Sequence, residues 1–474
     1  MSCFMYSNSM NVGLRVLLAS FSACLGILVF PPIGWHLVAV IAWIPLVYGI
    51  SGAKPSHALY LGLLHGVLFY GVTMSWLLDV FDGSLYLVAT LILIMALFTG
   101  VFARGYAVAY LRYGRGWVTA LFAAVWWTGV EFYRGELFYL KFPWMTPGVG
   151  LEPTWLTPLM GVYGLGFLLV MGAAMLCQKN KQRCFGGVLL LVMLASVLMQ
   201  KRKEASLGES VLVAAVQAEE SDLDHYIKLT KYAKAASDQD FDLVIWPEYA
   251  LPYDIRKDKR QWPQLTRFST EMGAEMVVGT QTSDDDGDWY NTALAFYGEQ
   301  VFGEHYKNHT VHFFDDGVAG TEAKAVHTPR WSYGTPICFD SDYQDVIRRM
   351  VADGAEFLVV PTMDAMHWGA KQQYQHSELF RHRAAENGRW IIVAATSGLT
   401  QVIDSNGNRL SSLPIIDEGV LVSELGRQSG LTFYTRMGWV FPWMAMGVGV
   451  VWMIWLFVEG LVDRRRSEVK VDEA

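Results

Sequence analysis

Long apolar segments occupy most of the first 200 residues and constrain the fold of this chain more than any other feature. A helix needs about 20 residues to cross a hydrocarbon core of roughly 30 Å. Seven segments in this region approach that length and are separated by short polar turns, and an eighth lies near the C-terminus. The sequence therefore predicts a polytopic helical membrane domain. The predicted spans cover about residues 11–30, 35–50, 57–80, 84–111, 117–133, 159–178, 184–199 and 439–462.

The composition is that of a membrane protein, and it argues against several classes of function. Hydrophobic residues make up 53% of the 474 residues and charged residues only 17%, whereas soluble domains carry about 25% charged residues. The net charge of −8 argues against a protein that binds nucleic acid. The five cysteines form no CxxC pair, so neither a zinc site nor a redox pair is expected.

Positive charges in the short loops predict the orientation of the membrane domain. Lysines and arginines lie between the second and third, the fourth and fifth, and the sixth and seventh spans, and again after the eighth. Because such residues favour the cytoplasmic side, we expect both termini in the cytoplasm and the long polar section outside. The cluster KRK at 201–203 opposes this orientation, but long translocated domains follow the rule poorly.

The polar section between the seventh and eighth spans has the pattern of an α/β domain. Short apolar runs such as 211–217, 242–248 and 356–362 are bounded by polar or turn residues, which is typical of buried strands. Residues 224–237 and 343–354 have a helical pattern instead. Alternating strands and helices predict a layered α/β fold.

Three residues that could act together chemically end or follow strand-like runs. Glu248 closes DLVIWPE, Lys307 follows VFGEHY and Cys338 closes SYGTPIC. Ligand groups gather at the carboxyl ends of strands in α/β folds, so these side chains can converge. A carboxylate can take the proton of a thiol, and an ammonium can stabilise the thiolate and then an oxyanion. Taken singly, each residue also fits an ordinary role. Cys338 could be a small buried apolar residue, and Glu248 and Lys307 could be charged residues on the solvent-exposed surface.

The order WPE, YKNH and ICF resembles the nitrilase superfamily, whose catalytic glutamate, lysine and cysteine lie on an αββα sandwich. The apolar half, with FPPIGW, KFPWM and GVYGLGFLL, is similar to apolipoprotein N-acyltransferases. That family is built as seven spans, an extracytoplasmic nitrilase-like domain and a final span. The resemblance covers nearly the whole chain, so we expect a polytopic membrane domain of about eight helices joined to an αββα domain.

The resemblance also implies roles for single residues. Glu248 would be the general base, Lys307 the residue that stabilises the oxyanion and the thiolate, and Cys338 the nucleophile. Arg383 and Glu386, in the pattern Arg-Ala-x-Glu, are expected to be structural. Other residues are expected to bind substrate or to support the three catalytic ones. They are Trp144 in KFPWM, Asp315, Phe339, Asp340 and Asp364.

Some loops depart from the family pattern. After the lysine the family usually has Leu-Val-Pro-Phe-Gly-Glu, where this chain has TVHFFDD, and an alignment without a gap places Asp315 at the glutamate. After the nucleophile the family usually has Tyr-Glu, where Phe339 and Asp340 stand, and its Ser-Asn-Asp-Ala-Trp-Phe is TMDAMHW here, which keeps Asp364. Both acid changes retract a carboxylate by one methylene, and catalytic contacts can be sensitive to about 1 Å.

Four regions are expected along the chain. They are a seven-helix transmembrane domain at 1–203, an extracytoplasmic nitrilase-like catalytic domain at 204–438, a final transmembrane helix at 439–463 and a cytoplasmic tail at 464–474.

Acyl transfer between two lipids would explain why a nitrilase-like domain carries membrane spans. The expected reaction moves a fatty acyl chain from a phospholipid, through a cysteine thioester, to the α-amine of the N-terminal diacylglyceryl-cysteine of a lipoprotein. No cofactor or metal is expected, and the protein is expected to be a monomer in the bacterial cytoplasmic (inner) membrane with its catalytic domain on the periplasmic side. Two alternatives stay open: a membrane-tethered amidase or nitrilase acting on a small amide, and a degenerate paralogue that binds lipid or lipoprotein.

Overall fold

The computed structural model describes residues 10–179, 181–200, 205–219 and 222–472. The chain divides into two compact units, here called the membrane unit and the sheet unit. The membrane unit comprises Met1–Glu152, Val162–Val197 and Trp439–Ala474, and the sheet unit comprises Pro153–Gly161 and Leu198–Gly438. The expected boundary at 203/204 and the end of the expected tail, 473–474, lie outside the described residues.

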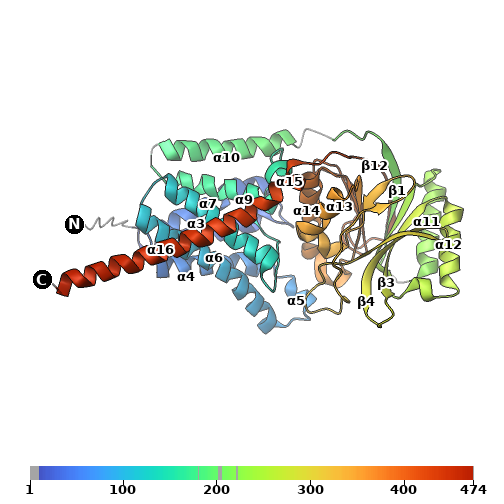
Figure 1. The fold of residues 1–474 in the computed structure, drawn as a ribbon, viewed down its shortest axis with the longest axis horizontal. Coiled ribbons are helices and arrows are strands. Elements are labelled where there is room, and N and C mark those ends of the chain that lie inside the picture. Colours follow the sequence, from blue (N-terminus) through green and yellow to red (C-terminus); the bar gives the residue numbers. More distant parts are fainter. Residues whose placement is uncertain (1–9, 180, 201–204, 220–221, 473–474) are drawn as a thin grey trace. The chain divides into compact units, whose positions relative to one another are not determined.

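The membrane unit is built from helices, of which α6 and α16 are long single rods (Figure 1). A 3₁₀ turn at His36–Val38 precedes α2, and a π-helical turn at Tyr133–Leu137 follows α7. The α-helices are α1 (Val12–Val29), α2 (Ala39–Ala42), α3 (Ile44–Ile50), α4 (Pro55–Thr73), α5 (Leu77–Val80), α6 (Leu85–Tyr113), α7 (Trp117–Phe132), α8 (Pro147–Gly150), α9 (Thr157–Leu176), α10 (Lys181–Gln200) and α16 (Phe441–Asp472).

Five helices in the described part of the chain are long and apolar enough to cross a membrane, so the chain has a helical membrane part. The second expected span is divided into the 3₁₀ turn at His36–Val38, α2 and α3, and the fifth is α7, with 16 residues. The third ends as α4 at Thr73 and is followed by the separate α5. The count of eight spans therefore stays a prediction. The five helices are Val12–Val29, Leu85–Tyr113, Thr157–Leu176, Lys181–Gln200 and Gly438–Asp463.

Small residues bring α4 and α6 into close contact within this unit. A Cβ atom on Gly62 would lie 2.5 Å from the carbonyl oxygen of Thr99, and one on Gly66 would lie 2.6 Å from the Cα of Ala96. Glycine is thus required at both positions for the two backbones to approach, as is common between helices in membranes.

The sheet unit contains two six-stranded sheets of mixed direction. The strand order is β12-β1-β2-β3-β4-β5 in the first and β11-β10-β9-β8-β7-β6 in the second, with β1, β2 and β3 parallel in one and β7, β8 and β9 parallel in the other. The strands are β1 (Ser210–Gln217), β2 (Leu243–Leu251), β3 (Glu275–Ser283), β4 (Trp289–Tyr297), β5 (Gln300–Tyr306), β6 (Val326–His327), β7 (Ser332–Gly334), β8 (Phe357–Thr362), β9 (Ile391–Ala395), β10 (Gln401–Ile403), β11 (Arg409–Ser412) and β12 (Gly419–Gly426).

Helices cover the outer face of each sheet, so the unit has the expected αββα layers (Figure 1). Helices α11 and α12 pack on the first sheet, and α13 and α14 pack on the second. The helices are α11 (Leu223–Ser237), α12 (Gln261–Met272), α13 (Asp345–Ala352), α14 (Gly369–Asn387) and α15 (Phe433–Arg436), with 3₁₀ turns η3 (Ile255–Lys257), η4 (Cys338–Asp342), η5 (Met366–Trp368) and η6 (Gly438–Val440).

Side-chain alternation along the strands divides the apolar residues among three cores. Ile245 and Val359 belong to the core shared by the two sheets, because neighbouring residues of a strand point to opposite faces. Val244 and Trp246 pack outward beneath α11 and α12, and Leu358 packs beneath α13 and α14. Strands buried on both faces read as continuous apolar runs, which is the pattern seen in the sequence.

Gly161 gives a test of how the segment Pro153–Gly161 joins the sheet unit. The backbone of α9 breaks there, with φ 62° and ψ −171°, and a Cβ would lie 2.4 Å from Cε2 of Tyr434 and 2.8 Å from Oε1 of Glu386. We expect Gly161→Ala to destabilise the protein by about 1–3 kcal/mol, measured as a lower midpoint of thermal unfolding in detergent. Gly447→Ala, with no atom within 4 Å of the added methyl group, should leave the midpoint near the wild-type value. Equal midpoints for the two variants would contradict this packing.

Candidate active site

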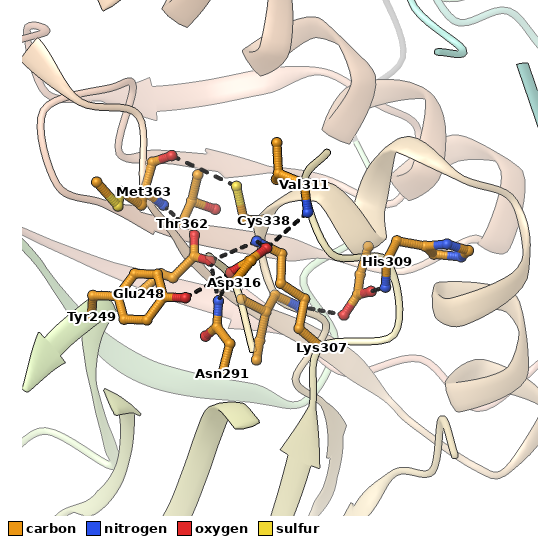
Figure 2. A network of polar contacts seen from close by, with 12 residues as sticks. Glu248, Tyr249, Asn291, Lys307, His309, Val311, Asp316, Cys338, Thr362 and Met363 are labelled. Atoms are coloured by element: carbon orange, nitrogen blue, oxygen red, sulfur yellow. Dashed lines mark hydrogen bonds and ion pairs between the residues drawn. The ribbon is translucent and has the colours of Figure 1, made fainter. Parts of the chain in front are cut away.

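A buried ion-pair cluster lies where β2 and β5 of the first sheet bring Glu248 and Lys307 together (Figure 2). The ammonium of Lys307 lies 2.8 Å from Oε1 of Glu248 and 2.8 Å from Oδ2 of Asp316. The side chains of Lys307 and Glu248 are only 2% and 1% exposed. Charges so deeply buried require partners, and here the ammonium of Lys307 stabilises the ionised forms of both carboxylates, which in turn stabilise the ammonium.

Two residues that sequence reasoning missed complete this cluster. The side-chain amide of Asn291 donates to Oε1 of Glu248 at 2.6 Å and to Oδ1 of Asp316 at 2.8 Å. The hydroxyl of Tyr249 donates to the same oxygen of Asp316 at 2.6 Å. Asn291 stands at the start of the apolar run NTALAFY, and Tyr249 directly follows Glu248. Their positions beside strand-like runs were visible, but nothing in the sequence linked either residue to an acid far along the chain.

Cys338 begins η4, close behind the short strand β7, and adopts a backbone φ of 45°. Its thiol donates to the carbonyl oxygen of Met363 at 3.7 Å, and the amide of Met363 donates to Oε2 of Glu248 at 2.7 Å (Figure 2). One residue after β8 therefore contacts the thiol with its carbonyl and the carboxylate with its amide. The structure thus brings the three predicted side chains into one buried site.

The two carboxylates on Lys307 have different proton affinities. Burial raises the pKa of Glu248, and the negative charge of Asp316 adds to this effect, although Lys307 opposes both. The pKa of Asp316 is lowered, because the pull of Lys307 and the hydrogen bonds from Tyr249 and Val311 outweigh its burial. Asp316 is therefore the permanent counter-ion of the lysine, whereas Glu248 is the group that can take up a proton. Pairs of acids with separated pKa values are typical of acid–base sites.

Burial and nearby charges also shift the pKa values of Cys338 and Lys307. Burial raises the pKa of Cys338, as do the charges of Glu248, Asp364 and Asp342, while Lys307 opposes the rise. The pKa of Lys307 lies well above its usual value, because the attraction of Glu248 and Asp316 outweighs burial. The resting thiol is thus protonated beside a permanent positive charge. It needs a base to take its proton, and Glu248 is suited to that task.

Asp340 joins the segment that carries Lys307 to the turn that carries Cys338. Its Oδ1 accepts hydrogen bonds from the backbone amides of Asn308 and His309, at 2.9 and 2.8 Å. Its Oδ2 accepts one from the amide of Ile337 at 3.2 Å and lies 2.8 Å from Nε2 of His305. The carboxylate is fully buried. Its geometry fits the supporting role expected for it, and that role stays a prediction.

The other predicted supporting residues differ in position. Phe339 packs its ring against Tyr343 with centroids 5.2 Å apart, and Asp364 lies buried directly after Met363. Trp144 belongs to the membrane unit, where it packs on Trp76, so a role in substrate binding stays a prediction.

The position expected for Asp315 is occupied by its neighbour Asp316. The ungapped alignment placed Asp315 at the family glutamate, but Asp315 is exposed, and Asp316 is buried against Lys307. A left-handed residue, Phe313 with φ 71°, shapes the loop so that the second aspartate turns inward. Counting residues could not reveal that turn.

Comparison with known proteins agrees with this arrangement. The family model described as the apolipoprotein N-acyltransferase N-terminal domain matches residues 22–175, and the carbon-nitrogen hydrolase model matches residues 212–430. The apolipoprotein N-acyltransferase of Geobacter metallireducens is 28% identical, over 95% of this chain and 96% of that protein. Both parts of the chain are thus similar to apolipoprotein N-acyltransferases. The relative of the same name from Methylococcus capsulatus is 25% identical, over 88% of this chain and 91% of its own.

Two solved structures are also similar to part of this chain. Nit3 of Saccharomyces cerevisiae is 20% identical, with a TM-score of 0.40, and covers 47% of this chain and 93% of its own. An amidase from Nesterenkonia sp. is 19% identical, with a TM-score of 0.40, and covers 49% of this chain and 95% of its own.

Replacing Asp316 tests the separation of the two acids. Asp316→Asn removes a negative charge that raises the pKa of Glu248, so this pKa should fall. Because a base must be ionised to act, the acidic limb of the pH–rate profile for acyl transfer should move to lower pH, by about one unit. Asp315→Asn, one residue away and exposed, should leave the limb in place. A limb that stays fixed or moves to higher pH in Asp316→Asn would show that the two acids are not coupled as described.

Proposed function

We infer that this chain is an N-acyltransferase of lipoproteins, and we propose that it works by a ping-pong cycle through a thioester on Cys338. The family and its carbon-nitrogen hydrolase domain support an acyltransferase. The observation that carries the mechanism is the double contact of Glu248. One oxygen binds the ammonium of Lys307, and the other binds the amide of Met363, whose carbonyl contacts the thiol.

In the first half of the cycle the acyl chain moves from the donor to the enzyme. Glu248 takes the proton of Cys338, and the thiolate attacks the ester carbonyl carbon of a phospholipid. Lys307 stabilises the oxyanion of the tetrahedral intermediate. The bond between the acyl carbon and the glycerol oxygen then breaks, and Glu248 returns its proton to that oxygen. A lysophospholipid leaves, and the acyl chain stays on sulfur as a thioester.

In the second half an amine takes the acyl chain. The acceptor is the α-amine of the diacylglyceryl-cysteine at the N-terminus of a lipoprotein. Its nitrogen attacks the thioester carbonyl while Glu248 accepts a proton from it, and Lys307 again stabilises the oxyanion. The carbon–sulfur bond breaks, the thiolate regains a proton from Glu248, and an amide is released. Each group thus ends the cycle in its starting state.

The orientation of the chain in the membrane decides which leaflet supplies the donor lipid. We place the protein in the bacterial inner membrane as a monomer, with both termini in the cytoplasm and the sheet unit outside, because the short basic loops favour that orientation. The donor then comes from the outer leaflet. A membrane-tethered amidase or a lipid-binding paralogue is not favoured, since relatives named as apolipoprotein N-acyltransferases match along nearly the whole chain.

Mass spectrometry of the purified protein in phospholipid vesicles tests the thioester. The peptide containing Cys338 should gain the mass of one acyl chain, and a diacylglyceryl-cysteine peptide should then remove it as an amide. Cys338→Ser and Glu248→Gln should lower the amount of acyl-enzyme by at least about 100-fold, because the nucleophile or its base is lost. Cys184→Ser, which removes an exposed thiol, should form it at the wild-type rate. Acyl-enzyme persisting in Cys338→Ser, or ammonia release from a small amide without acyl transfer, would reject the proposal.

Labelling in cells tests the orientation. In a Cys3→Ser, Cys24→Ser, Cys184→Ser background, Asp285→Cys places a thiol on the exposed turn between β3 and β4. A maleimide that cannot cross the inner membrane should label it in intact spheroplasts. Asp463→Cys, exposed near the end of α16, should be labelled only after lysis. Reversal of this pattern would place the sheet unit in the cytoplasm.

A further inference from the structure

His376 of α14 lies between two aspartates inside the sheet unit. It is 1% exposed, its Nδ1 lies 2.8 Å from Oδ1 of Asp364, and its Nε2 lies 3.3 Å from Oδ1 of Asp342. A neutral imidazole carries one N–H, so it can donate to only one of the two carboxylates. The doubly protonated imidazolium can donate to both, and the arrangement therefore favours a positive charge.

Both aspartates belong to the segments that form the surroundings of the nucleophile. Asp342 ends η4, the turn that begins at Cys338. Asp364 directly follows Met363, whose amide and carbonyl contact Glu248 and the thiol. His376 thus contacts both of these segments, through Asp342 in one and Asp364 in the other.

The charges that act on the imidazole come from these two aspartates. Burial lowers the pKa of His376, but the attraction of Asp364 and Asp342 outweighs it and raises the pKa from 6.5 to about 10. Gln372 adds a neutral hydrogen bond to Asp364 at 2.8 Å, and the ring of Phe380 packs on the imidazole. His376 is therefore positively charged at neutral pH.

We propose that His376 is a positively charged positioning residue, which holds Asp342 and Asp364 beside Cys338 and offsets one of their two negative charges. With one positive and two negative charges, the group carries a net charge of −1. Both aspartates disfavour the thiolate of Cys338, so a neutral residue at 376 would leave −2 and make the thiolate harder to form. The proposal rests on Cys338 being the acyl carrier, as proposed above.

The ease with which the thiol ionises can be measured apart from acyl transfer. The purified full-length protein is treated with iodoacetamide across a range of pH, and the modification rate is followed by mass spectrometry on the peptide that contains Cys338. The midpoint of the rate against pH reports the ionisation of that thiol alone. Failure of the acyl-enzyme experiment would leave this measurement interpretable, so the two proposals fail separately.

Two variants should shift the midpoint in opposite directions, and their combination should restore it. His376→Gln changes the group charge from −1 to −2 and should raise the midpoint by about one pH unit. Asp342→Asn changes it from −1 to 0 and should lower the midpoint. The double variant restores −1 and should return the midpoint close to that of the wild type. His382→Gln, a buried histidine on the same helix, is the matched control and should not move it.

A purely structural histidine predicts a different result. Looser packing would change the modification rate by the same factor at every pH and leave the midpoint in place. Unshifted midpoints in His376→Gln and Asp342→Asn would overturn the proposal, as would a rise in Asp342→Asn. Should His376→Gln fail to fold, judged by thermal unfolding, Asp342→Asn and the double variant still decide the matter, because a charge effect requires their midpoints to differ.

Discussion

The ammonium of Lys307, buried between two carboxylates, is the interaction on which the site depends. A charge in the interior costs several kcal/mol unless partners surround it. Lys307 follows β5, Glu248 lies on β2 and Asp316 lies in a loop, so the requirement for partners fixes three separate segments relative to one another. Removing one member of such a cluster leaves an uncompensated charge and costs about 3–5 kcal/mol. The residues that would perform the chemistry are therefore also residues that hold the end of the sheet together.

The difference in pKa between Glu248 and Asp316 decides which of the two carboxylates can take up a proton. If both carboxylates were equal partners of the lysine, neither would accept a proton readily. Asp316 receives additional hydrogen bonds from Tyr249 and the amide of Val311 and stays ionised. Glu248 is more deeply buried and is destabilised by Asp316, so its proton affinity is higher. In the proposed mechanism a proton taken from the thiol therefore goes to Glu248, while Lys307 keeps its charge for the oxyanion.

Much of this architecture could be predicted from local patterns. The apolar segments indicated membrane helices, and the strands buried on both faces indicated an α/β layer structure. Glu248, Lys307 and Cys338 stood out because each is a reactive residue beside an apolar run. Contacts that depend on loop conformation could not be predicted: Asp316 replaces Asp315 because the loop at Phe313 is left-handed. Asn291 and His376 were missed as parts of the site because their partners lie far away in sequence, and hydrogen-bond geometry leaves no local pattern.

Backbone strain lies at two of the residues around which the site is built. Cys338 and Tyr249 both have positive φ, 45° and 57°, a conformation that costs about 1–3 kcal/mol for residues other than glycine. Such strain persists only where surrounding contacts enforce it. At Cys338 the enforcing contacts come from Asp340, which binds the amide of Ile337 on one side and the Lys307 segment on the other. At Tyr249 the enforcing contact is its hydroxyl on Asp316. Asp316 and Asp340, which contact Lys307 and the segment after it, therefore also hold Tyr249 and Cys338 in strained geometry, so charge burial and backbone strain support one another at the same site.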